Sequence, residues 1–391
     1  MTFPLLSESL TQTQPGDPAP GFSLPTVKHA NFALDSMGGR YLLLCFFGSA
    51  AEAHAQMACK AAYSRPDLFD DRHASFFGVS IDPGDKSEAR LIHRSAGHRH
   101  FLDFELKASK LYGALPRTAT SADALDILVR QWIVIDPAMR VIAAIPFRPD
   151  RSDIAETISL IQALDAPGRF TGIDLMAPIL YLPRVFEPEL CRHLIEAYEA
   201  EGGEESGFMR EIGGRTLAIL DPGFKRRKDV RLRDEELLKE IQMRFRRRVI
   251  PEIVKAHQFK VTRMERYIVA CYAADDGGHF SAHRDNTSKG TAHRRFAVSI
   301  NLNNDFEGGE ISFPEYGPRS YKAPPGGAVV FSCSLLHKVS KVTDGRRYAF
   351  LPFLYDDAAA RIRQANAHLV GPDMTRSEDA EAGTQSADAV A

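Results

Sequence analysis

Three side chains that could bind one metal ion stand in two short stretches of the C-terminal half. His283 and Asp285 form the only His-x-Asp in the chain, and His337 follows later. On extended backbone, residues two apart point to the same face, so the imidazole of His283 and the carboxylate of Asp285 can reach one ion. Two imidazoles and one carboxylate, with the other metal positions open, suit non-haem Fe(II) chemistry with dioxygen. We therefore predict His283, Asp285 and His337 as metal ligands.

A cation that could recognise a co-substrate follows the second histidine. Arg347 comes ten residues after His337, inside the run Gly345-Arg346-Arg347-Tyr348. A buried guanidinium one strand away from a metal could pair with a dicarboxylate through two parallel hydrogen bonds. The four residues together suggest a metal site with a dicarboxylate bound beside it.

Around these residues, the sequence predicts two helices followed by a series of short strands. Helices are predicted at Glu187–Tyr198 and Asp234–His257, and after about residue 260 short apolar runs alternate with Gly, Pro, Asn and Asp turns. This pattern is typical of an all-β barrel or double sheet supported by helices. The predicted strands are Glu265–Tyr272, Arg295–Leu302, Gly309–Phe313, Gly327–Ser332 and Tyr348–Tyr355.

The N-terminal part alternates strand-like and helix-like segments instead. Its short, continuous apolar runs predict buried strands, and its apolar residues at helical spacing predict helices, so we expect a mixed α/β sheet. The predicted strands are Tyr41–Phe47, Ser75–Ile81, Gln131–Asp136 and Arg140–Pro146, and the predicted helices are Ala50–Tyr63 and Asp153–Leu164. Ala166-Pro167-Gly168 breaks the pattern. We therefore expect one domain over residues 1–168, a second over 176–365, and an acidic tail over 366–391 that is disordered.

The run from about Glu265 to Tyr355 resembles the prolyl-4-hydroxylase-like branch of the 2-oxoglutarate/Fe(II)-dependent dioxygenases. The matching segments, in order, are HRD at 283–285, DFEGGEISFPE at 305–315, PGGAVVFSCSLLHKVSKV at 325–342 and GRRYAF at 345–350. The helical preface from about Leu182 is also similar to that family. The resemblance implies a mainly-β double-stranded β-helix, or jelly roll, with supporting helices and with the metal at one end.

The resemblance also assigns roles to individual residues. His283, Asp285 and His337 match the iron ligands. Arg347 matches the basic residue that binds the distal carboxylate of 2-oxoglutarate, because strand alternation places only one of Arg346 and Arg347 inside and the family's basic residue directly precedes the aromatic. The matches imply that Tyr272 helps to hold the co-substrate and that Asn301 is an inward-facing contact to it. The implied cofactors are Fe(II), 2-oxoglutarate and O2, with ascorbate as a candidate reductant. The implied reaction is hydroxylation, with release of succinate and CO2.

Residues 14–165 resemble a peroxiredoxin, an α/β protein of the thioredoxin-like fold. The matching segments are GDPAPGF at 16–22 and then YLLLCFF, ASFFGVSID, KLYGAL and WIVIDPAMRV. The segment 48–54, where relatives carry the peroxidatic cysteine, holds none. The resemblance therefore implies a degenerate peroxiredoxin-like domain, with a role in substrate binding, dimerisation or regulation.

Composition excludes several classes of function. The 49 basic and 51 acidic residues give a net charge of −2, which argues against a nucleic-acid-coating protein. Five scattered cysteines form no disulfide framework and fit a reducing cytoplasm. The longest apolar run falls short of the roughly 20 residues of a membrane span, and no signal peptide is visible. We expect a cytoplasmic protein with a protein, peptide or small-molecule substrate, without nucleic-acid or membrane partners, and a homodimer is consistent with the peroxiredoxin-like part.

Two rival hypotheses remain open at this point. One is a thiol peroxidase that acts through Cys59, whose thiol would have to be accessible and readily ionised. The other is a non-catalytic iron- or oxygen-sensing scaffold, which would bind the metal without turnover.

Overall fold

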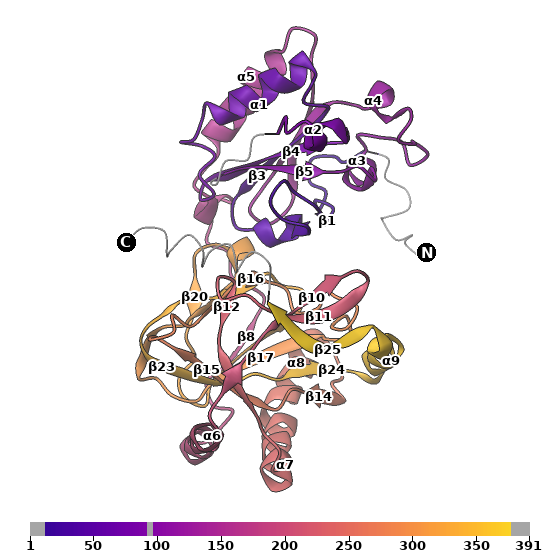
Figure 1. Cartoon of the computed structure of the whole chain (residues 1–391). Coiled ribbons are helices and arrows are strands. Elements are labelled where there is room, and N and C mark those ends of the chain that lie inside the picture. The colour runs from indigo at the N-terminus through magenta and orange to yellow at the C-terminus, as the bar shows by residue number, and fades with distance from the viewer. Residues whose placement is uncertain (1–11, 92–96, 377–391) are drawn as a thin grey trace, which may run out of the picture. The chain divides into compact units, whose positions relative to one another are not determined.

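A computed structural model describes residues 12–91 and 97–376 (Figure 1). The chain divides into two compact units, Met1–Met176 with Pro314–Pro318, and Ala177–Phe313 with Arg319–Ala391. Across the described ranges, no helix is both long and apolar enough to cross a membrane.

The first unit is built on a five-stranded sheet of order β5-β4-β3-β6-β7. Strands β3, β4 and β5 run parallel, whereas β6 and β7 form an antiparallel extension. The sheet strands are β3 (Tyr41–Gly48), β4 (Ala74–Ser80), β5 (His98–Leu102), β6 (Gln131–Ile135) and β7 (Val141–Pro146), and a small hairpin joins β1 (Ser23–Leu24) to β2 (Phe32–Ala33). The helices are η2 (Leu34–Met37), α1 (Ala53–Tyr63), α2 (Gly84–Ser87), α3 (Lys107–Leu111), α4 (Ala124–Ile127), α5 (Ser152–Ala163) and η3 (Pro167–Arg169).

The central strand β3 explains why its sequence is apolar throughout. Alternate residues of a strand face opposite sides of the sheet. Leu42, Leu44 and Phe46 lie in one buried cluster, while Leu43 and Cys45 lie in a second one that includes residues of α1 and α5. Both faces of the sheet are therefore covered, as parallel strands require. The predicted α/β, thioredoxin-like class of this unit is confirmed.

The second unit begins with helices that pack on a large sheet. These are α6 (Pro188–Glu201), α7 (Glu235–Arg244), the π-helical turn η4 (Phe245–Val249) and α8 (Ile250–His257). Asp234 caps α7 by accepting a hydrogen bond from the Leu237 amide at 2.7 Å. The single helix predicted over Asp234–His257 is thus interrupted. Pro251 has no N–H to donate to the carbonyl four residues earlier, which favours the π turn just before it.

Two main sheets and a small third one follow from the pairing of short strands. The ten-stranded sheet has the path β14-β24-β17-β23-β15-β13-β9, with β18, β21 and β8 paired off it, and the five-stranded sheet has the order β12-β16-β22-β19-β20. The strands of the larger sheet are β8 (Leu180–Leu182), β9 (Glu204–Glu205), β13 (Lys228–Arg231), β14 (Arg263–Glu265), β15 (Ile268–Ala273), β17 (Phe296–Asn301), β18 (Phe306–Gly308), β21 (Ala328–Ser332), β23 (Val342–Phe350) and β24 (Phe353–Tyr355). The smaller sheet holds β12 (Lys225–Arg226), β16 (His279–His283), β19 (Ile311–Ser312), β20 (Ser320–Tyr321) and β22 (His337–Val339), and η5 (Pro314–Tyr316) lies between β19 and β20 in sequence.

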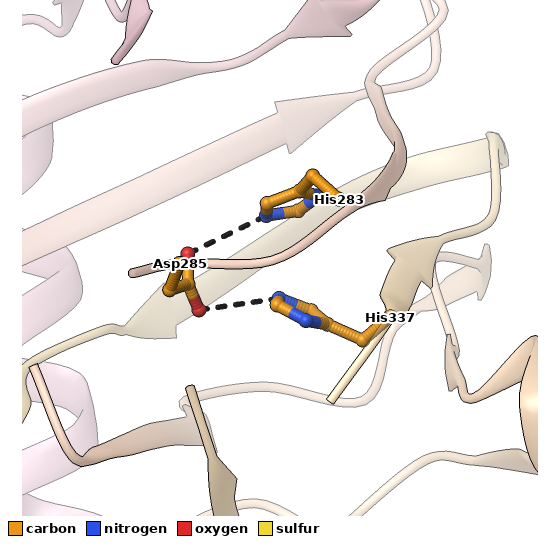
Figure 2. Close-up of side chains that lie close together, drawn as sticks. All are labelled: His283, Asp285 and His337. Carbon is orange, nitrogen blue, oxygen red and sulfur yellow. Dashed lines mark ion pairs between the residues drawn. The ribbon is translucent and has the colours of Figure 1, made fainter. Parts of the chain in front are cut away.

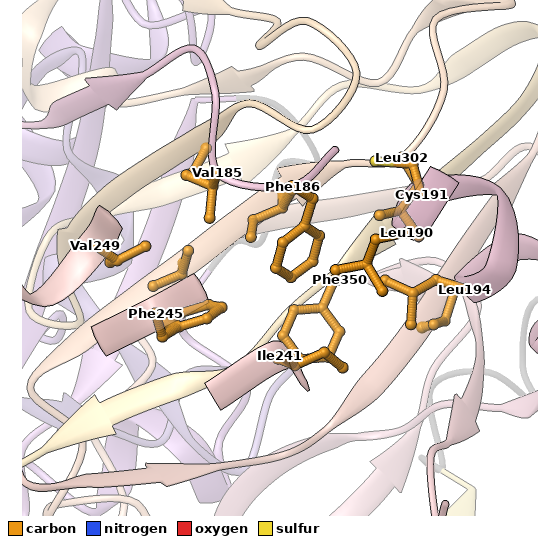
Figure 3. Close-up of a cluster of buried hydrophobic side chains, with 14 of the residues drawn as sticks. Val185, Phe186, Leu190, Cys191, Leu194, Ile241, Phe245, Val249, Leu302 and Phe350 are labelled. Carbon is orange, nitrogen blue, oxygen red and sulfur yellow. The ribbon is translucent and has the colours of Figure 1, made fainter. Parts of the chain in front are cut away.

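Strand alternation in the larger sheet separates a packed face from a polar one. Val298 and Ile300 belong to the core under α6, α7 and η4. Figure 3 shows Phe350 of the same core beside Ile241 of α7 and Phe245 of η4. Ser299, between Val298 and Ile300, and Arg347, three residues before Phe350, face the other side of the sheet, toward the interior of the unit. The predicted mainly-β jelly-roll class with supporting helices is confirmed.

The C-terminal part of the second unit continues beyond the predicted limit of residue 365. Helix α9 (Asp357–Asn366) leads through η6 (Ala367–Leu369) into β25 (Val370–Arg376). Strand β25 pairs in parallel with β11 (Arg215–Leu220), which in turn pairs with β10 (Phe208–Ile212). The predicted acidic tail over residues 366–391 thus begins with residues that have assigned secondary structure as far as Arg376, and its disorder stays a prediction. Residues 377–391 lie outside the described part.

Candidate active site

The structure brings the three predicted metal ligands together at the ends of two paired strands. His283 ends β16 and stands directly opposite His337, the first residue of β22. Asp285 follows two residues after His283, with its Oδ1 3.5 Å from Nε2 of His283 and its Oδ2 3.3 Å from Nε2 of His337 (Figure 2). One ligand atom from each residue lies within 4.8 Å of the others. This group is compact enough for one ion to touch all three.

Backbone hydrogen bonds fix which nitrogen of each imidazole is free. Nδ1 of His283 lies 2.7 Å from the Ser281 carbonyl, and Nδ1 of His337 lies 3.0 Å from the Leu335 carbonyl. Because a carbonyl only accepts, each Nδ1 carries the hydrogen and each Nε2 keeps its lone pair. A metal-binding histidine needs this arrangement, in which the outer nitrogen is held by a second partner. The donor set therefore fits a divalent transition metal such as Fe(II).

Burial and charge set the protonation of the group. The side chains of His283, Asp285 and His337 are 13%, 12% and 7% exposed. Burial lowers the pKa of His337 to about 4, helped by the neighbouring His283. Burial also tends to raise the pKa of Asp285, but the two imidazoles hold the pKa of that carboxyl well below its usual range. At neutral pH, His337 is neutral and Asp285 is ionised, which are the forms that bind metal.

A β-bulge and two aromatic rings enclose the imidazoles. The β16–β22 register shifts between Phe280 and His283, so three residue steps along β16 lie opposite two steps along β22. As a result, the rings of Phe280 and His283 stack, with centroids 3.5 Å apart. Phe331, from β21 of the larger sheet, lies 4.6 Å from the His337 ring. The metal ligands thus sit between the two sheets beside apolar walls.

Arg347 is buried in the interior and is incompletely paired. Its side chain donates from Nε to Asn301 Oδ1 at 2.9 Å and from Nη2 to Ser299 Oγ at 2.8 Å. Arg347 is 1% exposed, and its buried Nη1 has no hydrogen-bond partner among the described residues. Burial lowers the pKa of this guanidinium. The neighbouring Arg346 is 55% exposed, so strand alternation places Arg347 inside as predicted from the sequence.

The two other predicted co-substrate contacts surround Arg347. Asn301 donates from Nδ2 to the Ala323 carbonyl at 2.8 Å while its Oδ1 accepts from Arg347, so both ends of its amide have protein partners. Asn301 therefore holds the guanidinium in place. Tyr272 is 1% exposed and stands directly opposite Arg347 on β15. The direct contacts of both residues with a co-substrate stay predictions.

Sequence reasoning missed three residues that shape this arrangement. Ser299 holds Arg347, and its position two residues before Asn301 was the available signal. Gly309 has φ +69°, and a Cβ there would lie 2.9 Å from Cδ of Arg347, so no side chain fits. Arg227 donates from Nη1 to the Tyr272 hydroxyl at 3.3 Å, a contact between residues 45 positions apart that no local pattern indicates.

The first unit carries an ion-paired cluster in the segment where the sequence lacks a cysteine. Glu52 pairs with Arg130 at 2.9 Å and with His54 at 2.7 Å. Cys59 lies on α1 and is 8% exposed, and burial raises the pKa of its thiol to about 12. A peroxidatic thiol needs the opposite properties.

Comparisons with known proteins agree with both halves of the chain. Residues 267–355 match the 2OG-Fe(II) oxygenase superfamily, and residues 15–144 match the AhpC/TSA family. A PKHD-type hydroxylase of Pseudomonas fluorescens (strain Pf0-1) is 28% identical over 184 residues, covering 44% of this chain and 75% of the relative. Another, from P. fluorescens strain Pf-5, is 38% identical over 91 residues but covers only 21% of this chain and 39% of the relative.

A solved prolyl hydroxylase of Trichoplax adhaerens, in complex with a peptide fragment of the hypoxia inducible factor oxygen degradation domain, aligns with 49% of this chain and 87% of its own. Its sequence identity is 14% and its TM-score is 0.37. In sequence, this chain is therefore similar to the 2OG-Fe(II) oxygenase superfamily over residues 267–355 and to the AhpC/TSA family over residues 15–144.

Proposed function

We propose that the C-terminal unit is an Fe(II)- and 2-oxoglutarate-dependent hydroxylase that acts on a protein, peptide or small-molecule substrate. The observation that carries this proposal is the convergence of His283, Asp285 and His337, whose ligand atoms lie within 4.8 Å of one another. This set occupies one side of an ion and leaves the other positions for a co-substrate and dioxygen. When bound there, Fe(II) would supply the oxidising chemistry that couples decarboxylation of 2-oxoglutarate to hydroxylation.

The incomplete pairing of Arg347 supports 2-oxoglutarate as the co-substrate. A buried cation without a counter-ion is costly, and the hydrogen-bond partners of Arg347 among the described residues, Asn301 and Ser299, are both uncharged. The distal carboxylate of 2-oxoglutarate would provide both the missing charge and an acceptor for Nη1. Ser299 and Asn301 already hold the other two donor groups, so the guanidinium is preorganised for one ligand.

The walls of the site suit oxidation of a carbon centre. Phe280 and Phe331 lie directly against the two imidazoles. Apolar neighbours exclude water from the reacting atoms and limit side reactions. The chain's own residues would thus bind and orient the co-substrate and keep the reacting centre dry.

The properties of Cys59 disfavour the thiol peroxidase hypothesis. Its thiol is buried and has a pKa of about 12, so almost no thiolate is available at neutral pH. The scaffold hypothesis shares the metal site and differs only in lacking turnover. The absence of a cysteine from residues 48–54 supports a non-peroxidatic role for the first unit, in substrate binding, dimerisation or regulation.

Succinate release tests the proposal directly. Purified protein with Fe(II), 2-oxoglutarate and oxygen should form succinate slowly even without substrate. His337→Ala should abolish this release, whereas His193→Ala, on the exposed side of α6, should not. Succinate release by wild type and His337→Ala at equal rates would contradict the proposal. Metal binding without any succinate would favour the scaffold.

Substrate identity can then be approached without a prior guess. A cell lysate treated with active protein should contain a product that has gained one oxygen, and this product should be absent after treatment with Asp285→Ala.

Five free, buried cysteines support a reducing, cytoplasmic location. Ascorbate as reductant and a homodimeric state remain predictions for the same purified protein.

A further inference from the structure

Tyr272 lies between two buried guanidinium groups. Arg347 stands opposite it in the β15–β23 ladder, with Cζ 5.2 Å from the centre of the Tyr272 ring. Arg227, the residue between β12 and β13, has its Cζ 5.7 Å from that centre and donates from Nη1 to the phenol oxygen at 3.3 Å. The oxygen of Tyr272 therefore acts as a hydrogen-bond acceptor toward Arg227.

Hydrogen bonds to neighbouring side chains fix the orientation of the Arg227 guanidinium. Its Nε and Nη2 donate to the two carboxylate oxygens of Asp229, both at 2.7 Å, and Nη2 also lies 3.2 Å from Ser206 Oγ. Arg227 is 8% exposed, and the charge of Asp229 outweighs burial and keeps the pKa of the guanidinium above its usual value. A bidentate pair of this kind fixes the plane of the guanidinium. Nη1 is consequently aimed at Tyr272.

The fixed acceptor role of Tyr272 leaves its hydrogen free for another partner. A hydroxyl whose oxygen receives a hydrogen bond donates its own hydrogen in a different direction. No described residue accepts that hydrogen, and Nη1 of Arg347 likewise has no acceptor. Two unsatisfied donors thus come from residues that face each other across β15 and β23. Two adjacent donors match the two oxygens of a carboxylate.

We propose that Arg227 is a positioning residue that orients the Tyr272 hydroxyl as a donor, so that Tyr272 and Arg347 together bind the distal carboxylate of 2-oxoglutarate. This inference rests on the proposed function and adds to it a residue outside the predicted site. Arg227 itself does not touch the co-substrate. Its effect is on the affinity for ligands that carry the distal carboxylate.

The test is calorimetric binding of 2-oxoglutarate to full-length protein loaded with Mn(II) in place of Fe(II). Arg227→Met should weaken binding by about tenfold, the size expected when a hydrogen bond to a charged group is lost. Arg227→Lys, which keeps a donor, should recover part of the loss. Arg231→Met, at the exposed far end of β13, is the matched control and should bind like wild type.

Two further measurements separate positioning from a structural role. In the Tyr272→Phe background, Arg227→Met should cause little additional loss, because the hydroxyl on which it acts is gone. Binding of 2-oxobutyrate, which keeps the keto acid but lacks the distal carboxylate, should be the same in wild type and Arg227→Met. The inference would be overturned if Arg227→Met weakened binding of both ligands equally. It would also be overturned if Arg227→Met weakened 2-oxoglutarate binding as much in the Tyr272→Phe background as in wild type. Failure of wild type to bind 2-oxoglutarate would instead overturn the proposed function.

Discussion

Replacing Arg347 by methionine should separate co-substrate binding from folding. The change removes the guanidinium but nearly preserves the side-chain volume. Removing one partner of a buried ion pair costs about 3–5 kcal/mol. At about 1.4 kcal/mol per tenfold, 2-oxoglutarate should therefore bind about 10²- to 4 × 10³-fold more weakly. Without ligand, the variant loses two hydrogen bonds of about 1 kcal/mol each but no longer buries an unpaired charge, so its stability should change by less than about 2 kcal/mol.

The assay for this prediction combines ligand titration with urea unfolding. Affinity for 2-oxoglutarate is measured by calorimetry on Mn(II)-loaded protein, and stability by the unfolding midpoint of the metal-free form. Arg346→Met is the matched control, because its side chain is more than half exposed and should leave the affinity unchanged. Unchanged 2-oxoglutarate affinity in Arg347→Met would refute the assignment of this residue. A large loss of stability together with the affinity would show that Arg347 serves the fold instead.

Three further perturbations give independent expectations. Glu265→Gln should destabilise the protein by about 3 kcal/mol at pH 7, because the buried carboxylate pairs with His293 and Arg294 and its pKa is lowered to about 2 from 4.5. That stabilisation is complete above pH 4.5 and is lost as the pH falls toward 2, so about 1.4 kcal/mol of it should be lost at pH 3.5. Urea unfolding midpoints of wild type and variant at the two pH values measure this loss, and an unchanged difference between them would contradict the prediction. Gly309→Ala should weaken 2-oxoglutarate binding in the same titration, since its Cβ would push Cδ of Arg347, and full affinity would contradict this. Cys59→Ser should leave peroxide consumption unchanged, and a loss would revive the thiol peroxidase.

Residues governed by strand alternation could be predicted from the sequence. Strand alternation predicts that only one of Arg346 and Arg347 faces inward, the resemblance indicates Arg347, and the structure buries Arg347 and exposes Arg346. The continuous apolar run of β3 predicted a strand buried on both faces, and its residues do divide between two cores. In each case a few adjacent residues suffice for the prediction, because side chains along a strand alternate between its two faces.

Features that depend on long-range pairing could not be predicted in this way. Arg227 contacts Tyr272 because β13 pairs with β15, and no sequence pattern near residue 227 indicates that pairing. Strand β25 forms in a polar segment because β11 offers it a free edge. The π turn before Pro251 had a local cause, the missing N–H, but apolar periodicity masked it.

The measurement that tests the central claim most directly is anomalous X-ray scattering from crystals grown with Mn(II) and 2-oxoglutarate. The account predicts one strong peak within bonding distance of Nε2 of His283, Nε2 of His337 and a carboxylate oxygen of Asp285. It also predicts the keto acid on that ion, with its distal carboxylate against Arg347. A metal peak elsewhere, or a keto acid whose far end is turned away from Arg347, would contradict it.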